Sequence, residues 1–256
     1  MTPRLPPPAD LIADLKAAIS FSTRFPLLHT ASLSGSDVAR ASWALPVAGA
    51  LVGLVGALVY WLAYRIGLPT LAAATLALAA TALATGCLHE DGLADVADGF
   101  GGGGTRERKL EIMSDSQIGT YGACALVLSL LLRIGAIANI AQPMSVLWAL
   151  LAAHIGARAM LPAFMWFVPP ARPDGLSAGA GRPPDTSVII AALIGAIALG
   201  VGLCPAAGLI ALGTVIIGAL VMAWLSHRQI AGQTGDVLGA VEQVSEILIL
   251  LVAVRI

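Results

Sequence analysis

Long apolar runs separated by short polar stretches dominate the chain. A helix needs about 20 mainly apolar residues to cross roughly 30 Å of hydrocarbon. Seven runs approach or reach this length: Trp43–Tyr64, Thr70–Leu88, Gly122–Ile140, Val146–Val168, Val188–Leu203, Ala207–Ser226 and Val237–Val254. The pattern predicts an all-α, polytopic membrane helical bundle of about seven transmembrane helices, with six or eight as alternatives. The short fifth run is expected to extend back toward Thr186 or to form a tight hairpin with the sixth around Cys204 and Pro205.

The segment before the first run has a different pattern. Over residues 9–25, small or apolar residues recur at helical spacing: Leu11, Leu15, Ala18 and Ser22. Charged residues are expected away from that stripe: Asp10, Asp14 and Lys16. This pattern predicts an amphipathic helix that lies at the membrane interface. The proline-rich start, Thr2–Pro8, precedes no short apolar core with a cleavage site, so no signal peptide is expected.

Composition strengthens the membrane assignment. Hydrophobic residues make up 58% of the 256 residues and charged residues 11%, with a mean hydropathy of +0.88. Soluble domains are about 25% charged, so this chain could not cover a water-exposed surface. A soluble globular protein, a disordered protein and a nucleic-acid binder are therefore excluded, and the lipid bilayer is the expected environment. The three cysteines, Cys87, Cys124 and Cys204, have no metal-ligand spacing.

The basic residues predict an orientation. With the N-terminus in the cytoplasm, that side carries ten of the 14 basic residues: Arg4, Lys16, Arg24, Arg40, Arg106, Arg108, Lys109, Arg172, Arg182 and Arg228. The opposite side carries only Arg65 and Arg255. Because cytoplasmic loops are enriched in Lys and Arg, we expect a multi-pass membrane protein with its N-terminus and its chemistry on the cytoplasmic side. Residues 1–256 are read as one membrane-embedded catalytic domain.

Acidic residues concentrate in one cytoplasmic segment, residues 89–121, which is rich in Asp and Gly. Asp91, Asp95 and Asp98 share one helix face if the second span continues past Leu88. Glu107, Glu111 and Asp115 repeat that spacing on the next segment. Two facing stripes of carboxylates suit Mg²⁺, which binds through a few carboxylates plus substrate phosphates. The alternative interpretation is a solvated acidic loop.

Glycines and basic residues follow the acidic stripe. Gly99 and Gly101–Gly104 are expected to end the helix and to let backbone amides approach an anion, beside Arg106, Arg108 and Lys109. Taken alone, the glycine run is equally compatible with a flexible hinge. Together with the carboxylates it predicts a phosphoryl-transfer site.

Ionisable residues within spans are functional hypotheses by default. Arg133 is expected to pair with a buried carboxylate such as Glu242 or Glu246. Arg158, four residues after His154, is expected either to contact substrate or to extend to the cytoplasmic headgroups. Glu242 and Glu246, with Asp236 just before the last span, could complete the acidic site.

Several segments resemble one family. The block His89…Asp91-Gly92-Leu93-Ala94-Asp95…Asp98-Gly99 is similar to the signature of the cobalamin synthase family (adenosylcobinamide-GDP ribazoletransferase). The same holds for Arg108…Leu110-Glu111-Ile112-Met113…Asp115-Ser116…Ile118-Gly119-Thr120-Tyr121-Gly122, for Gly232-Gln233-Thr234-Gly235-Asp236-Val237-Leu238-Gly239-Ala240…Glu242…Glu246, and for Phe21-Ser22-Thr23-Arg24-Phe25-Pro26. The resemblance covers essentially the whole chain. Three departures are Glu90, usually apolar in the family, Gln117 for a common Arg, and Ala231 for a glycine.

The resemblance implies a transferase that joins adenosylcobinamide-GDP to α-ribazole, or to its 5′-phosphate, and releases GMP with the help of Mg²⁺. It implies metal ligands at Asp91, Asp95, Asp98, Glu111 and Asp115, and a proton acceptor that is either a carboxylate or His89. Substrate contacts are expected from eight residues: Arg24, Arg106, Arg108, Ser116, Arg158, Thr234, Asp236 and Glu242. The oligomeric state is left open, a homo-oligomer included.

Two other functions stay open at this point. Asp95…Asp98-Gly99 followed by Asp115 loosely resembles the membrane CDP-alcohol phosphotransferases, although the Ala-Arg pair of their motif is absent. A transporter would use Arg133, Arg158, Glu242 and Glu246 as an ion pathway, but no internal repeat supports it.

Overall fold

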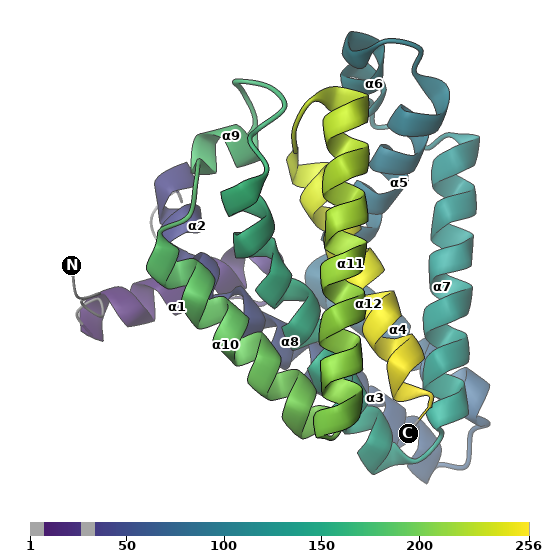
Figure 1. Cartoon of the computed structure of the whole chain (residues 1–256). Coiled ribbons are helices and arrows are strands. Elements are labelled where there is room, and N and C mark those ends of the chain that lie inside the picture. The colour runs from purple at the N-terminus through teal and green to yellow at the C-terminus, as the bar shows by residue number, and fades with distance from the viewer. Residues whose placement is uncertain (1–7, 27–33, 256) are drawn as a thin grey trace.

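The computed structural model describes residues 8–26 and 34–255, and within these ranges it is a bundle of helices (Figure 1). The elements in chain order are α1 (Pro8–Ser22), α2 (Gly35–Ala41), the 3₁₀ turn η1 (Ser42–Ala44), α3 (Leu45–Arg65), α4 (Thr70–Thr85), α5 (Leu88–Gly102), α6 (Arg106–Ile112), α7 (Thr120–Ile140), α8 (Pro143–Phe167), α9 (Leu176–Ala180), α10 (Asp185–Gly202), α11 (Pro205–Ile230) and α12 (Gly235–Ala253). The all-α prediction is confirmed. Arg4 and residues 2–7 of the proline-rich start lie outside the described residues.

Among the described residues, five helical segments are long and apolar enough to cross a membrane: Gly35–Arg65, Thr120–Ile140, Pro143–Phe167, Asp185–Gly202 and Pro205–Ile230. A sixth span is obtained if the bent pair α4 and α5 counts as one. The sequence predicts about seven spans with six as an alternative, and by length and composition the described helices supply five or six candidates. The fifth predicted run does extend back to Asp185, and a tight connection at Cys204 joins it to the sixth.

The second and seventh predicted spans account for the difference. The run Thr70–Leu88 does not continue as helix, because Gly86 and Cys87 both have positive φ, 67° and 59°, and the chain turns by 90° into α5. At 16 residues, α4 is about 24 Å long and too short to span alone. The seventh run forms α12, which carries three acidic residues, Asp236, Glu242 and Glu246, and packs inside the bundle against α5, α8 and α11.

Small residues set the closest helix packing. A Cβ on Gly49 of α3 would meet the carbonyl of His154 on α8, and one on Gly53 would lie 2.9 Å from the carbonyl of Leu150. Without a hydrophobic driving force between helices in lipid, such close backbone approach is a main source of helix association. This packing holds α8, which carries His154 and Arg158, firmly in the interior.

The N-terminal helix is placed by a buried acid. Asp14 of α1 is fully buried, where it accepts hydrogen bonds from Arg40 Nε at 2.9 Å and Trp43 Nε1 at 3.0 Å. The expectation that Asp14 points away from the packed stripe is therefore wrong, because two donors on α2 and η1 satisfy it inside. Ala18 and Ser22 of that stripe are buried as predicted. That α1 lies at the membrane interface stays a prediction.

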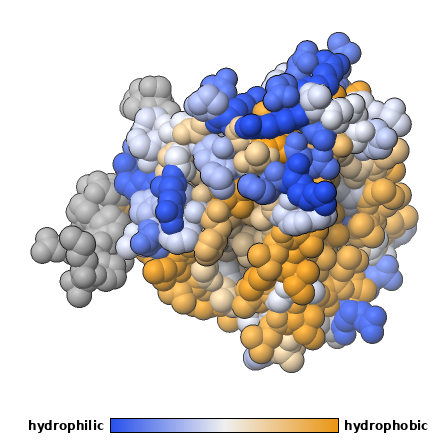
Figure 2. All heavy atoms as spheres, turned by 45° about the horizontal axis from the view of Figure 1, so that its top comes forward, coloured by the Kyte–Doolittle hydropathy of each residue, from blue (hydrophilic) through white to orange (hydrophobic). Residues whose placement is uncertain are grey.

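The connections between helices differ at the two ends of the bundle. One end carries α6, α9 and the turn at residues 231–234, and we call it the polar end. Residues 66–69, 141–142 and 203–204 form only short turns between helix pairs. Figure 2 shows hydrophilic residues gathered over the polar end, with a broad hydrophobic surface below them.

Hydrogen bonds join the segments of the polar end. Gln233 pairs with the 169–171 segment through its backbone, at 2.9 Å from its amide to Pro169 O and 2.8 Å from the Ala171 amide to its carbonyl. Its side-chain oxygen accepts a hydrogen bond from Ser177 Oγ at 2.7 Å. Arg172 donates to Ser114 Oγ at 2.8 Å. The polar end is thus one connected structure.

Candidate active site

Helix α5 carries the predicted acidic stripe as a separate helix. The helix is interrupted at Gly86 and Cys87, so the acidic stripe lies on a helix that is turned by 90° from α4 and does not continue the second predicted span. Asp91 is exposed, Asp95 is half-buried, and Asp98 is buried at 7% exposure. Burial thus increases along the stripe, and the three carboxylates meet different surroundings.

Close packing of α5 on α12 brings a fourth carboxylate to the stripe. A Cβ on Gly92 would lie 2.7 Å from the carbonyl of Asp236, and one on Gly239 would lie 3.3 Å from His89 Cα. Asp95 lies within electrostatic range of both Asp91 and Asp236. We call Asp91, Asp95 and Asp236 the acidic cluster.

Thr234 fixes the start of α12. Its hydroxyl accepts a hydrogen bond from the Val237 amide at 3.3 Å and donates one to Asp236 Oδ2 at 3.1 Å. Such an N-cap satisfies an otherwise unpaired amide and defines where the helix begins. Thr234 is 3% exposed, so it orients Asp236 rather than offering an open surface to substrate.

An apolar cavity of about 210 Å³ opens beside the acidic cluster. We call it the base cavity. Its walls come from α1, α2, the start of α3, α5, α8, α9 and α12, and Asp91, His89 and Asp236 are among its lining residues. Two carboxylates from different helices therefore border one hydrophobic space.

Asp98 has another environment. Its carboxylate accepts hydrogen bonds from two amides at the start of α7, that of Gly119 at 2.7 Å and that of Gly122 at 2.9 Å. A Cβ on either glycine would collide with this carboxylate. A negative charge at a helix N-terminus is favourable, because the first amides are unpaired and the helix dipole is positive there. Asp98 thus holds α7 against α5.

The remaining predicted ligands lie on the far side of Asp98. Asp98 and Asp115 border a second hollow, of about 280 Å³, that does not include Asp91 or Asp236. Glu111 is exposed and pairs with Arg108 at 2.7 Å. Within the described ranges, no three of the predicted acidic ligands have oxygens all within 4.8 Å of one another. The structure thus divides the predicted ligands between two hollows.

The glycine run has a packing role. Helix α5 passes through Gly99 and ends at Gly102, with Gly103 as its C-cap, so the glycine run ends the helix as expected. A Cβ on Gly99 would collide with Met113, one on Gly101 would lie 2.7 Å from the ring of Tyr121, and one on Gly103 would collide with Lys109. The missing side chains let α6 and the start of α7 approach α5 closely.

The predicted phosphate-binding arginines lie in different places. Arg106 donates to Ile230 O at 2.9 Å and also to Ala171 O, which joins α6 to the end of α11 and to the segment that follows α8. Arg108 is exposed and Ser116 is exposed. Arg24 is exposed and packs its side chain on Gly86, at the bend between α4 and α5. The structure does not bring these four residues together.

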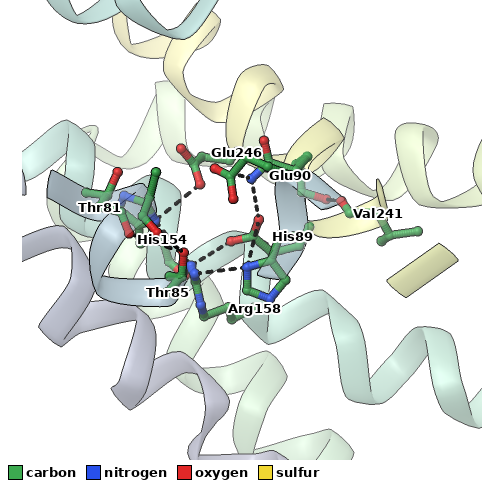
Figure 3. A network of polar contacts seen from close by, with 12 residues as sticks. Thr81, Thr85, His89, Glu90, His154, Arg158, Val241 and Glu246 are labelled. Atoms are coloured by element: carbon green, nitrogen blue, oxygen red, sulfur yellow. Dashed lines mark hydrogen bonds and ion pairs between the residues drawn. The ribbon is translucent and has the colours of Figure 1, made fainter. Parts of the chain in front are cut away.

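A buried polar network lies deeper in the bundle (Figure 3). Arg158 Nη1 on α8 contacts Glu242 Oε1 on α12 at 2.6 Å, and Arg133 Nη1 on α7 contacts Glu246 Oε1 at 3.3 Å. The expected pairing of Arg133 with Glu246 is confirmed. Arg158 is 1% exposed, so the alternative that it extends to the headgroups is wrong.

Helix α5 joins this network through two residues. Glu90 Oε1 lies 3.1 Å from Arg133 Nη1, and His89 Nδ1 lies 3.3 Å from Arg158 Nη2 and 3.6 Å from Glu242 Oε2. Sequence reasoning did not find the pairing of Glu90. A usable signal was present, since Glu90 was the one acidic departure from the family pattern and Arg133 needed a partner.

His154, Glu242 and Glu246 form a set of ligand atoms within 4.8 Å of one another. Both guanidinium groups already contact these carboxylates, and His154 Nδ1 lies 3.2 Å from Glu246 Oε2. Two neighbouring positive charges oppose a further cation, so the arrangement is a network of ion pairs. It holds Arg158 and Glu242, predicted to contact substrate, against each other.

Comparison with known proteins identifies the family of the chain. The cobalamin-5-phosphate synthase family matches residues 14–254. A protein from Bradyrhizobium diazoefficiens is 59% identical over 95% of this chain and 94% of its own length, and one from Mesorhizobium japonicum is 52% identical over 96% and 94%. A third, from Azorhizobium caulinodans, is 46% identical over 94% and 95%. All three are named adenosylcobinamide-GDP ribazoletransferase.

No solved structure matches the chain. The family match and the three relatives span nearly its whole length and include the acidic cluster, the buried network and the polar end. The chain belongs to the cobalamin-5-phosphate synthase family.

Proposed function

We propose that this protein is an adenosylcobinamide-GDP ribazoletransferase. It joins adenosylcobinamide-GDP to α-ribazole, or to its 5′-phosphate, and releases GMP. The name of its relatives supports the reaction. The observation that carries it in the structure is the position of Asp91 and Asp236, which come from two helices and border one apolar cavity.

The chemistry follows from that position. A ribose hydroxyl oxygen attacks the phosphorus attached to cobinamide, the new P–O bond forms, and the bond to the bridging oxygen of the diphosphate breaks. GMP leaves with the bridging oxygen. The hydroxyl proton passes to a carboxylate at the cavity edge, where Asp91 and Asp236 both line the apolar space. No covalent intermediate with the protein is needed.

The acidic cluster fits a magnesium ion. Mg²⁺ takes oxygen ligands, keeps several waters and uses one or two carboxylates together with substrate phosphates. Asp91 and Asp236, with Asp95 beside them, meet that requirement. Asp91 and Asp236 would hold this ion, and it would supply positive charge to offset the charge on the transferred phosphoryl group and on the departing GMP. Asp98 is assigned a positioning role, because the amides of α7 bind both of its oxygens.

We further propose that the polar end faces the cytoplasm of a bacterial inner membrane. Arg106, Arg108 and Arg172 lie at the polar end, whereas Arg65 is the last residue of α3 and Arg255 follows α12, both at the opposite end. Enrichment of basic residues on the cytoplasmic side supports this orientation.

The direct test is an assay of the detergent-purified protein with adenosylcobinamide-GDP and α-ribazole. We expect equal amounts of GMP and of the corrinoid product by chromatography, and loss of both when Mg²⁺ is chelated. A parallel reaction with a CDP-linked alcohol should release no CMP. Absence of GMP under all metal conditions, or release of CMP instead, would contradict the proposal.

A further inference from the structure

The base cavity is too small for a whole substrate. Its volume of about 210 Å³ lies below the roughly 300 Å³ or more of sites that enclose drug-sized ligands. A corrinoid is far larger than such ligands, so the cavity can hold only one part of one substrate. The candidate parts are the flat bases: the guanine of the GDP group, the adenine of the adenosyl group and the dimethylbenzimidazole of α-ribazole.

The polar groups of the cavity separate these candidates. Both of its serine hydroxyls already donate within the protein, Ser42 Oγ to Ala39 O at 2.8 Å and Ser177 Oγ to Gln233 Oε1 at 2.7 Å, so neither hydroxyl proton is left for a ring nitrogen or carbonyl of a base. Most of the remaining wall is aliphatic or aromatic, with Val38, Leu45 and Leu161 among its residues. Guanine and adenine have polar edges, and burying them without partners is costly. Dimethylbenzimidazole has an apolar edge with two methyl groups.

The position of the two carboxylates that line the cavity also favours dimethylbenzimidazole. Asp91 and Asp236 belong to the cavity lining but also to the acidic cluster, so they mark the side that faces the proposed chemistry. A base seated among the aliphatic residues would place its attached ribose at these carboxylates. The attacking hydroxyl would then lie where its proton can be accepted.

We infer that the base cavity is the subsite for the dimethylbenzimidazole base of α-ribazole, which presents the ribose to Asp91 and Asp236. This inference rests on the proposed function and adds the place of the nucleophilic substrate. The acidic cluster is then shared between the two substrates, with the diphosphate on its open side.

Val38→Phe tests the assignment. Val38 lines the cavity from α2, is only half-buried and belongs to neither hydrophobic core cluster, so a larger ring can fill the cavity without disturbing the bundle. We expect the KM for α-ribazole to rise about tenfold or more, while the KM for adenosylcobinamide-GDP changes less than about twofold. Val59→Phe on α3 is the matched control, because Val59 is equally half-buried and lies outside the cavity.

A smaller ligand distinguishes a cavity filled by the new phenylalanine from a misfolded variant. The α-ribazole analogue without its two methyl groups should lose less affinity in Val38→Phe than α-ribazole does, because the smaller base needs less room. A structural defect would affect both ligands equally and would overturn the inference. A raised KM for adenosylcobinamide-GDP alone would instead place the guanine or adenine there, and unchanged constants would show a cavity that holds no substrate.

Binding without turnover keeps this test separate from the proposed function. Equilibrium dialysis of α-ribazole against the purified protein should show binding that Val38→Phe weakens and Val59→Phe does not. If the wild-type protein released no GMP but showed this pattern, the reaction would be wrong and the subsite correct. If it released GMP and Val38→Phe bound α-ribazole normally, the subsite would be wrong and the reaction correct.

Discussion

Arg158 on α8 and Glu242 on α12 form an ion pair of 2.6 Å between two side chains that are almost completely buried. Two opposite charges in a low-dielectric interior hold two helices at one relative position, because separation would leave each charge uncompensated. His89 contacts both residues, so the pair also fixes the first turn of α5. The buried network thus positions the helix that carries the acidic stripe.

Loss of one partner of the Arg158–Glu242 ion pair should therefore lower the stability of the fold. Glu242→Gln leaves Arg158 without its main counter-charge, and we expect it to lower the stability by about 3–5 kcal/mol. Thermal unfolding in detergent, followed by light scattering, measures the change. Arg65→Gln is the control, since Arg65 is exposed at the far end of α3. Equal stability of the two variants would contradict a structural role for the pair.

Asp98→Asn should separate positioning from metal binding. The amide oxygen can still accept one of the two backbone hydrogen bonds, but its NH₂ group would face the other amide, so we expect a loss of about 1–3 kcal/mol. The rate should fall, whereas the Mg²⁺ concentration for half-maximal GMP release should not change. A shifted Mg²⁺ midpoint would make Asp98 a ligand, as the sequence pattern first suggested.

Asp91→Asn and Asp236→Asn should weaken Mg²⁺ binding and leave the stability of the fold nearly unchanged. Both carboxylates belong to the acidic cluster, and replacing either removes a charged oxygen ligand without changing side-chain volume. We expect GMP release to fall about a hundredfold or more, and the Mg²⁺ midpoint to rise, with little change in thermal stability. Asp115→Asn, in the second hollow, is the comparison. An equal rise of the Mg²⁺ midpoint in Asp115→Asn would mean that the two hollows share the metal.

Gly92→Ala tests the contact between α5 and α12. The new methyl group would lie 2.7 Å from the Asp236 carbonyl, so the helices must separate and the acidic cluster must open. We expect loss of activity together with reduced stability. Gly213→Ala on α11 is a matched control, because nothing lies within 4 Å of its Cβ position and alanine favours a helix by about 0.5–1 kcal/mol. Retained activity in Gly92→Ala would show that this spacing is not needed.

The proposed orientation predicts a labelling pattern. Cys204 is exposed in the turn between α10 and α11, opposite the polar end. With Cys87 and Cys124 replaced by alanine, an impermeant maleimide should label Cys204 in intact cells. With all three cysteines replaced, Ser116→Cys at the polar end should react only after the membrane is opened. The reverse labelling pattern would mean that the polar end and its active site face the outside of the cell.

Local sequence patterns determined much of this protein. Apolar run length and the absence of charge predicted the membrane bundle, because burial in lipid depends on the composition of each segment alone. Helical periodicity placed Asp91, Asp95 and Asp98 on one face, and that face persists on α5. The need of Arg133 for a buried counter-charge indicated Glu246 correctly.

The tertiary structure decided what those residues do. The bend at Cys87, a non-glycine residue with positive φ, divides the second predicted span and turns α5, although an apolar pattern runs through it. Contacts between helices then commit Asp98 to α7, join Glu90 to Arg133 and bring Asp236 beside Asp91. These relations depend on which helix faces meet, and that is set by close approaches such as Gly92 on Asp236. Periodicity describes one helix at a time, so it carries no information about its partner.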